Sequence, residues 1–105
     1  MLTRRKLFSL IDNFLIELKD LGYSPQKAIL FGSYAKGHPH NNSDVDLALW
    51  DEKFCGVNFI DFEPFVHLIS KFHPLQLHTF PAGETQDDNP FIEEIAKTGI
   101  EIHLP

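Results

Sequence analysis

Two short segments that have the pattern of β-strands constrain the fold of this chain more than any other feature of its sequence. The first, residues 28–31 (AILF), is apolar throughout, which is typical of a strand buried on both faces. In the second, residues 44–49 (DVDLAL), the apolar residues recur at every second position, the period of a strand. We therefore expect a sheet in which these two strands form the centre.

Three amphipathic segments predict helices around this sheet: residues 3–21, a segment that begins between residues 58 and 64 and is closed by Pro74, and a segment between Pro90 and Gly99. Thr3 and Asn89 occupy N-cap positions, and Gly22 stands where the first helix should stop. Two more alternating segments, 75–79 and 100–104, predict further strands. The order is that of an α/β domain with about four strands flanked by helices.

Composition restricts the class of protein. A length of 105 residues predicts one domain spanning residues 1–105. The chain has 15 Asp and Glu against 9 Lys and Arg, a net charge of −6, which argues against binding nucleic acid directly through charge. The single cysteine, Cys55, excludes an internal disulfide. No apolar run approaches the roughly 18 residues of a membrane span, and no secretory signal follows Met1, so we expect a cytoplasmic protein without membrane contact.

The paired aspartates of the second strand are the first candidate for chemistry. Side chains two apart on a strand share a face, so Asp44 and Asp46 should project together while Val45 and Leu47 enter the core. Two neighbouring carboxylates repel each other unless a cation lies between them. Mg²⁺ suits such a pair, because it takes carboxylate oxygens and completes its coordination with phosphate oxygens and water. A solvated strand edge is the ordinary alternative for such a pair taken alone.

Gly32 and Ser33 end the first strand and are the second candidate. A buried strand that breaks at Gly-Ser into a short helical turn presents backbone N–H groups and a hydroxyl at one point, an arrangement that binds phosphate. Glycine permits close backbone approach there, and Lys36 can add a positive charge. A phosphate site at one strand end beside a carboxylate pair on another strand predicts a site for a metal–triphosphate complex.

These residues resemble a known family. Gly32-Ser33, ten intervening residues and then Asp44-x-Asp46 is similar to the signature of the minimal nucleotidyltransferases of the DNA polymerase β-like superfamily. The same family has similar residues around this motif, at 33–37 (SYAKG), 43–48 (SDVDLA) and 91–100. The resemblance therefore covers nearly the whole chain. It implies a small mixed sheet, Mg²⁺ held by Asp44 and Asp46, and the triphosphate of ATP or another NTP held by Gly32, Ser33 and Lys36.

The resemblance also implies a reaction and a partner. The family transfers a nucleoside monophosphate from an NTP to a hydroxyl and releases pyrophosphate. Stand-alone domains of this size often accompany a helical HEPN-domain protein as the antitoxin half of a toxin–antitoxin pair, and AMP transfer to that partner is the expected activity. The alternative is a catalytically weak nucleotide-binding antitoxin that neutralises its partner by occlusion.

One departure from the family pattern bears on catalysis. The family usually carries a third carboxylate on the next core strand, but residues 75–80 (LQLHTF) contain none. Gln76 or His78 stands on the face where the acid should be, and of these only histidine can take a proton near neutral pH. Three alternatives stay open: His78 acts as the base, an acid from residues 84–88 reaches the site, or the domain binds nucleotide without turning it over quickly.

His38 and His40 form a candidate zinc pair, but Pro39 between them and the lack of a second ligand pair favour an ordinary loop. Three aromatic residues, Trp50, Phe54 and Phe59, fall outside the helical stripes. Two interpretations stay open for them: an exposed partner surface, which would also give weak self-association, or a hydrophobic floor for a base.

Overall fold

The computed structural model describes residues 1–105 and contains a four-stranded mixed sheet in the order β3-β2-β1-β4. The strands are β1 (Lys27–Phe31), β2 (Val45–Asp51), β3 (Leu75–Pro81) and β4 (Ile100–Glu101). β1 is antiparallel to both β2 and β4, whereas β2 and β3 are parallel. The helices are α1 (Arg4–Asp20), α2 (Ser33–Lys36), α3 (Asn58–Phe62), α4 (Val66–Lys71) and α5 (Phe91–Thr98), with a 3₁₀ turn η1 (Glu63–Phe65) before α4. The predicted α/β class with four strands is confirmed.

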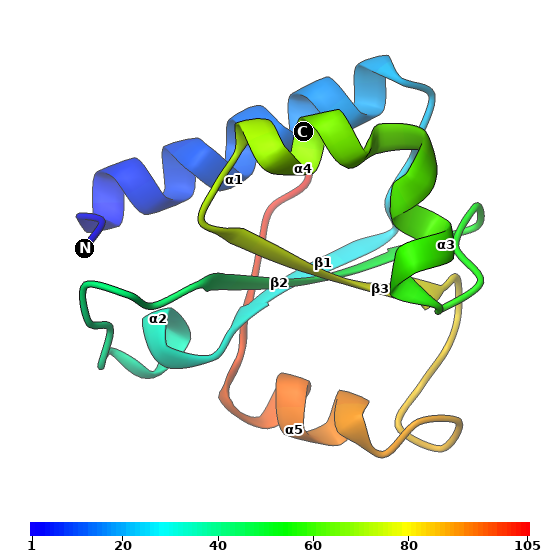
Figure 1. The fold of residues 1–105 in the computed structure, drawn as a ribbon. Coiled ribbons are helices and arrows are strands. Elements are labelled where there is room, and N and C mark those ends of the chain that lie inside the picture. The colour runs from blue at the N-terminus through cyan, green and yellow to red at the C-terminus, as the bar shows by residue number, and fades with distance from the viewer.

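Helices cover both faces of the sheet (Figure 1). α1 and α4 lie on one face, and α5 lies on the other. The short helix α2 directly follows the end of β1. The central strand β1 therefore contributes to two cores: Ala28 and Leu30 pack in the larger one under α1, and Ile29 and Phe31 in the smaller one over α5. This double burial is what the uninterrupted apolar run predicted.

The first and last helices begin as their sequences predict. The Thr3 side chain accepts a hydrogen bond from the Lys6 amide (3.2 Å), which caps α1. The Asn89 side chain accepts one from the Phe91 amide (3.0 Å) at the start of α5, with Pro90 already at helical angles. No helix in the molecule is long and apolar enough to cross a bilayer.

The predicted long second helix is wrong, because the segment divides into α3, η1 and α4. Pro64 lies at the break: it has no N–H to donate to the preceding turn, which interrupts the helical hydrogen bonds although Glu63 before it keeps helical angles (φ −48°, ψ −47°). The Phe65 backbone then departs from helical angles (φ −137°, ψ 29°) before α4 resumes. The apolar positions on both sides of the break still pack on the sheet, which is why their spacing resembled one helix.

Two element ends differ from expectation in smaller ways. The last strand is only two residues long, although the Ile102 amide continues its direction by donating to the Ala28 carbonyl (2.8 Å). Leu21, the last residue of the helix predicted over 3–21, follows the end of α1 and is exposed.

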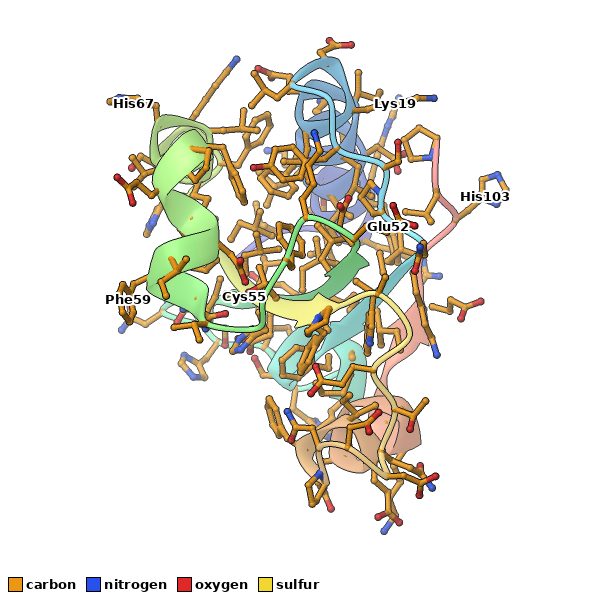
Figure 2. All side chains as sticks on the ribbon, turned by 90° about the vertical axis from the view of Figure 1, so that its right-hand side faces the viewer. Lys19, Glu52, Cys55, Phe59, His67 and His103 are labelled. Atoms are coloured by element: carbon orange, nitrogen blue, oxygen red, sulfur yellow. The ribbon has the colours of Figure 1, made fainter.

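Two of the three aromatic residues expected at the surface are in the core. Trp50 is buried and stacks on Phe80 with ring centroids 4.8 Å apart, and Phe54 is buried against Tyr23 and Phe65. Trp50 extends β2 beyond the segment that the alternation marked, so its side chain joins the core over α5. Only Phe59 is exposed, at 77% of its surface, and Figure 2 shows it directed away from the molecule.

A buried carboxylate, Asp61, ties α3 to the edge of the sheet. It accepts hydrogen bonds from the Cys55 amide (2.9 Å), the Gly56 amide (3.0 Å) and the Thr79 hydroxyl of β3 (2.7 Å). Burial alone would raise the pKa of Asp61, but the hydrogen bonds from Cys55, Thr79 and Gly56 outweigh it and hold the pKa below its usual value of 3.8. The ionised form is therefore the one that stabilises the fold.

This network predicts a specific acid sensitivity. Because the pKa of Asp61 is lower in the folded than in the unfolded chain, its contribution is complete above the unfolded value of 3.8 and is lost as pH falls through the folded value. Asp61→Asn should lower the free energy of unfolding by about 1–3 kcal/mol at pH 7, and the deficit should shrink below about pH 4. Urea unfolding from pH 3 to 7 measures this, with the exposed Asp87→Asn as control; a deficit that is constant over the whole range would contradict the assignment.

Candidate active site

The candidate site lies on the face of the sheet that carries α5, near the ends of β1 and β2 that point toward α2 (Figure 1). Asp46, the second residue of β2, stands in register with Phe31 of β1 on one side and Gln76 of β3 on the other. Its neighbours in sequence, Val45 and Leu47, are fully buried in the opposite core. The alternation of β2 thus places the Asp46 carboxylate on the α5 face, while Val45 and Leu47 fix the strand in the core on the opposite face.

The Asp46 carboxylate packs directly against the backbone of Gly32. The glycine adopts φ +78° and ψ −157°, a backbone conformation essentially restricted to glycine. A Cβ added there would lie 3.2 Å from Asp46 Cγ and would collide with Asp46 Oδ2. The absence of a side chain at residue 32 therefore lets the strand-to-helix turn close directly against the carboxylate.

His78 forms a pair with Asp46 across the two parallel strands. His78 Nε2 lies 3.2 Å from Asp46 Oδ1, although His78 is in register with Ala48 and so reaches diagonally. Because an ionised carboxylate only accepts, Nε2 is the donor and Nδ1 is the nitrogen that can accept a proton. About a quarter of each side chain is exposed, 24% for His78 and 26% for Asp46, so solutes can reach both.

Two phenylalanine rings, Phe31 and Phe91, lie next to the His78 imidazole. The His78 ring meets Phe31 edge to face with centroids 4.9 Å apart, and Phe91 lies 6.2 Å from His78 and 5.8 Å from Phe31. Phe31 comes from β1 and Phe91 from the first turn of α5. Neither ring was predicted to belong to the site, although the position of Phe31 directly before Gly32 is a usable signal in the sequence.

Ser33, Lys36 and Asp44 make no hydrogen bond or ion pair with Asp46 or His78. Ser33 begins α2 and is partly exposed, and Lys36 at the end of α2 is exposed and makes no ion pair. Asp44 is exposed just before β2 and lines a cavity of about 310 Å³ together with Tyr34 and His73. The structure therefore brings Asp46 and His78 together and does not pair Asp44 with either of them.

Comparisons with known proteins identify the family and the fold. The family model described as polymerase beta, nucleotidyltransferase matches residues 13–104. The chain belongs to this nucleotidyltransferase family. A candidate nucleotidyltransferase of Sulfolobus solfataricus, solved at 1.40 Å, has a similar fold: its TM-score is 0.54 and its identity 16%, over 91% of this chain and 78% of the other. A comparison with curated proteins gives no match.

Nucleotidyltransferases of this family generally use an NTP and Mg²⁺, and the residues of this domain fit that ion. Asp46 offers a hard oxygen ligand on β2, and Asp44 offers another from the position just before the strand; both carboxylates are at least partly exposed. No group of three His, Cys, Asp or Glu side chains is close enough together to hold a metal ion. Mg²⁺ tolerates this, because it commonly keeps waters and phosphate oxygens and takes only one or two carboxylates.

Gln76 of β3 stands in register with Asp46, on the face where the family resemblance predicts a third carboxylate. The acids of residues 84–88 are not close substitutes, because their loop leaves the opposite end of β3, where the Trp50 indole N–H donates to the Glu84 carbonyl (2.9 Å). Asp51, at that end of β2, lies five positions along the strand from Asp46, a span of about 16 Å. Of the proton acceptors considered from the sequence, His78 is therefore the one that lies beside Asp46.

Proposed function

We propose that this domain is a Mg²⁺-dependent enzyme that transfers AMP from ATP to a hydroxyl group of a HEPN-type partner protein, as the antitoxin of a toxin–antitoxin pair. One observation carries the catalytic part of this proposal: Gly32 closes on the carboxylate of Asp46, whose other oxygen holds His78. This arrangement offers a place for phosphate after β1, a metal ligand on β2 and a proton acceptor on β3, which are neighbouring strands. A structural sheet edge would need none of the three.

The triphosphate would lie against the turn at Gly32. The Ser33 hydroxyl can donate to phosphate oxygens there, and the Lys36 ammonium has no competing partner in the chain. Mg²⁺ held by Asp44 and Asp46 would neutralise charge on the phosphates, which matters because the chain itself carries a net charge of −6.

In the proposed reaction the acceptor hydroxyl oxygen attacks the α-phosphorus of ATP. A new bond forms from that oxygen to the α-phosphorus, the bond from the α-phosphorus to the bridging oxygen breaks, and pyrophosphate leaves. His78 Nδ1 takes the hydroxyl proton, while the hydrogen bond from Nε2 to Asp46 fixes the ring and stabilises the imidazolium that results. Phe31 packs against the ring and limits its rotation.

His78→Ala should lower the rate of AMP transfer by about 10²- to 10⁴-fold, the usual size of a general-base contribution. His78→Gln is the sharper variant, because its amide can still donate to Asp46 but cannot take the proton. Both are measured by transfer of label from α-³²P-ATP to the co-purified partner in a single turnover. His67→Ala, on the exposed surface of α4 (Figure 2), is the control. A wild-type rate for His78→Gln would contradict the role of His78 as general base and leave it a positioning residue.

A specific observation supports the alternative of a nucleotide-binding antitoxin that acts by occlusion. The domain lacks the third acid, and no cluster of three candidate metal ligands is present. The occlusion hypothesis uses the same nucleotide site but predicts that no label is ever transferred to the partner. It also predicts that the Asp46→Asn variant neutralises the partner toxin as fully as the wild type does. The transfer assay therefore separates the two functions.

The surface around Phe59 is the proposed contact with the partner. Val57, Phe59 and Ile60 expose apolar side chains on and beside α3, whereas Trp50 and Phe54 no longer belong to this surface. Phe59→Glu should weaken the complex with the HEPN-type protein by about 30-fold or more, since a hot-spot aromatic contributes about 2 kcal/mol or more. Co-purification and calorimetry measure this. The variant should fold normally and keep Mg²⁺-ATP affinity, and an unchanged complex would place the interface elsewhere.

A further inference from the structure

An exposed aromatic ring, Phe91, stands beside the candidate site. It is 45% exposed although it begins α5, whose other apolar residues Ile92 and Ile95 are buried against the sheet. Its ring lies 5.8 Å from Phe31 and 6.2 Å from His78, on the α5 face where Asp46 also projects. A lone exposed phenylalanine is ordinary, but this one borders the residues proposed to bind the nucleotide.

Two contacts hold the Phe91 residue. The Asn89 side chain accepts a hydrogen bond from the Phe91 amide (3.0 Å), which fixes the start of the helix, and Phe31 meets the ring nearly at right angles, with an interplanar angle of 82°. Phe31 also directly precedes Gly32 in the chain, so a single side chain connects the Phe91 ring with the turn that would receive the phosphates.

We infer that Phe91 is the platform on which the base of the bound NTP stacks, and that it makes the domain prefer purine over pyrimidine triphosphates. This inference rests on the proposed nucleotide site. Stacking on a flat ring favours purines because they offer the larger face, and it accepts adenine and guanine alike because every base has a π-face. The Asn89 side chain, the nearest amide in sequence, is already engaged by the Phe91 backbone and does not distinguish the two purines.

Calorimetry with three probes tests the inference: Mg²⁺-ATP, Mg²⁺-CTP and Mg²⁺-tripolyphosphate, which lacks a nucleoside. Phe91→Ala should weaken Mg²⁺-ATP about 5- to 100-fold, the range for loss of one stacked base, and should leave tripolyphosphate unchanged. Phe91→Trp should retain ATP affinity, and Phe91→Leu, which keeps an apolar side chain against Phe31, should behave like Phe91→Ala if stacking is the cause. Phe59→Ala, a second exposed phenylalanine on another face, is the matched control.

The expected pattern is tighter binding of ATP than of CTP by the wild-type domain, and loss of this difference in Phe91→Ala. Equal ATP affinity in wild type and Phe91→Ala would overturn the platform while leaving the proposed nucleotide site intact. Equal affinity of the wild type for ATP and tripolyphosphate would overturn it as well, because the base would then contribute nothing. If neither probe binds the wild-type domain, the inference and the proposed function fall together.

Discussion

Asp46→Asn should weaken binding of Mg²⁺-ATP by about 10²- to 10³-fold. The substitution keeps the shape of the side chain and an oxygen that can accept from His78, but it removes the charge that faces the cation. Loss of one unit charge near a cation at about 4 Å corresponds to about 3–4 kcal/mol at an effective dielectric constant near 20. Calorimetric titration of both proteins in the same magnesium buffer measures the difference.

Asp87→Asn is the matched control for that comparison. Asp87 is also an exposed carboxylate, but it belongs to the loop that leaves the opposite end of β3. Both variants change the net charge by one, so long-range repulsion of ATP changes equally in the two. If Asp87→Asn weakened Mg²⁺-ATP as much as Asp46→Asn, a general charge effect would explain both and Asp46 would lose its role as a ligand.

Gly32→Ala should lower both stability and activity. The backbone conformation at residue 32 costs about 1–3 kcal/mol for a residue with a Cβ, and the added methyl would displace the Asp46 carboxylate. Since misplacement of a catalytic group by about 1 Å can cost about 10²-fold in rate, AMP transfer should fall by at least that factor. Thermal unfolding and the labelled-ATP assay measure the two effects separately.

Gly37→Ala separates backbone strain from the collision. Gly37 also has a positive φ (+80°), but no atom lies within 4 Å of the position that a Cβ would take. This variant should lose about 1–2 kcal/mol of stability and keep its transfer rate. Similar activity losses in the two variants would mean that strain of the α2 turn, and not the fit of Gly32 against Asp46, determines activity.

The fold was predictable from local patterns because the two central strands and the first and last helices each carry their own signals. Apolar runs, alternation and caps depend on neighbours in sequence, so residues 28–31 and the Asn89 cap could be assigned without knowing their packing. The division of the second helix was missed although Pro64 is a local signal for it. The stripe of apolar residues continues across the proline and so resembles one uninterrupted helix.

The candidate site was predictable in its residues but not in its contacts. The spacing of Gly32 and Asp46 marks both as site residues, yet the collision that makes glycine necessary depends on the antiparallel register of β1 and β2. The pair of His78 with Asp46 depends on the register of two parallel strands joined by a long connection, for which the sequence has no signal. The burial of Trp50 and Phe54 was missed for the same reason, since their partners Phe80, Tyr23 and Phe65 are distant in sequence.

Calorimetric titration of the wild-type domain with ATP, in Mg²⁺ and in EDTA, tests the central claim most directly. The claim is that the α5 face of the sheet binds a metal–triphosphate complex through Gly32, Asp46 and the residues beside them. The account predicts saturable binding in Mg²⁺ and, because ATP and a chain of net charge −6 repel each other, at least tenfold weaker binding in EDTA. Equal affinity in the two buffers, or no binding in either, would contradict it.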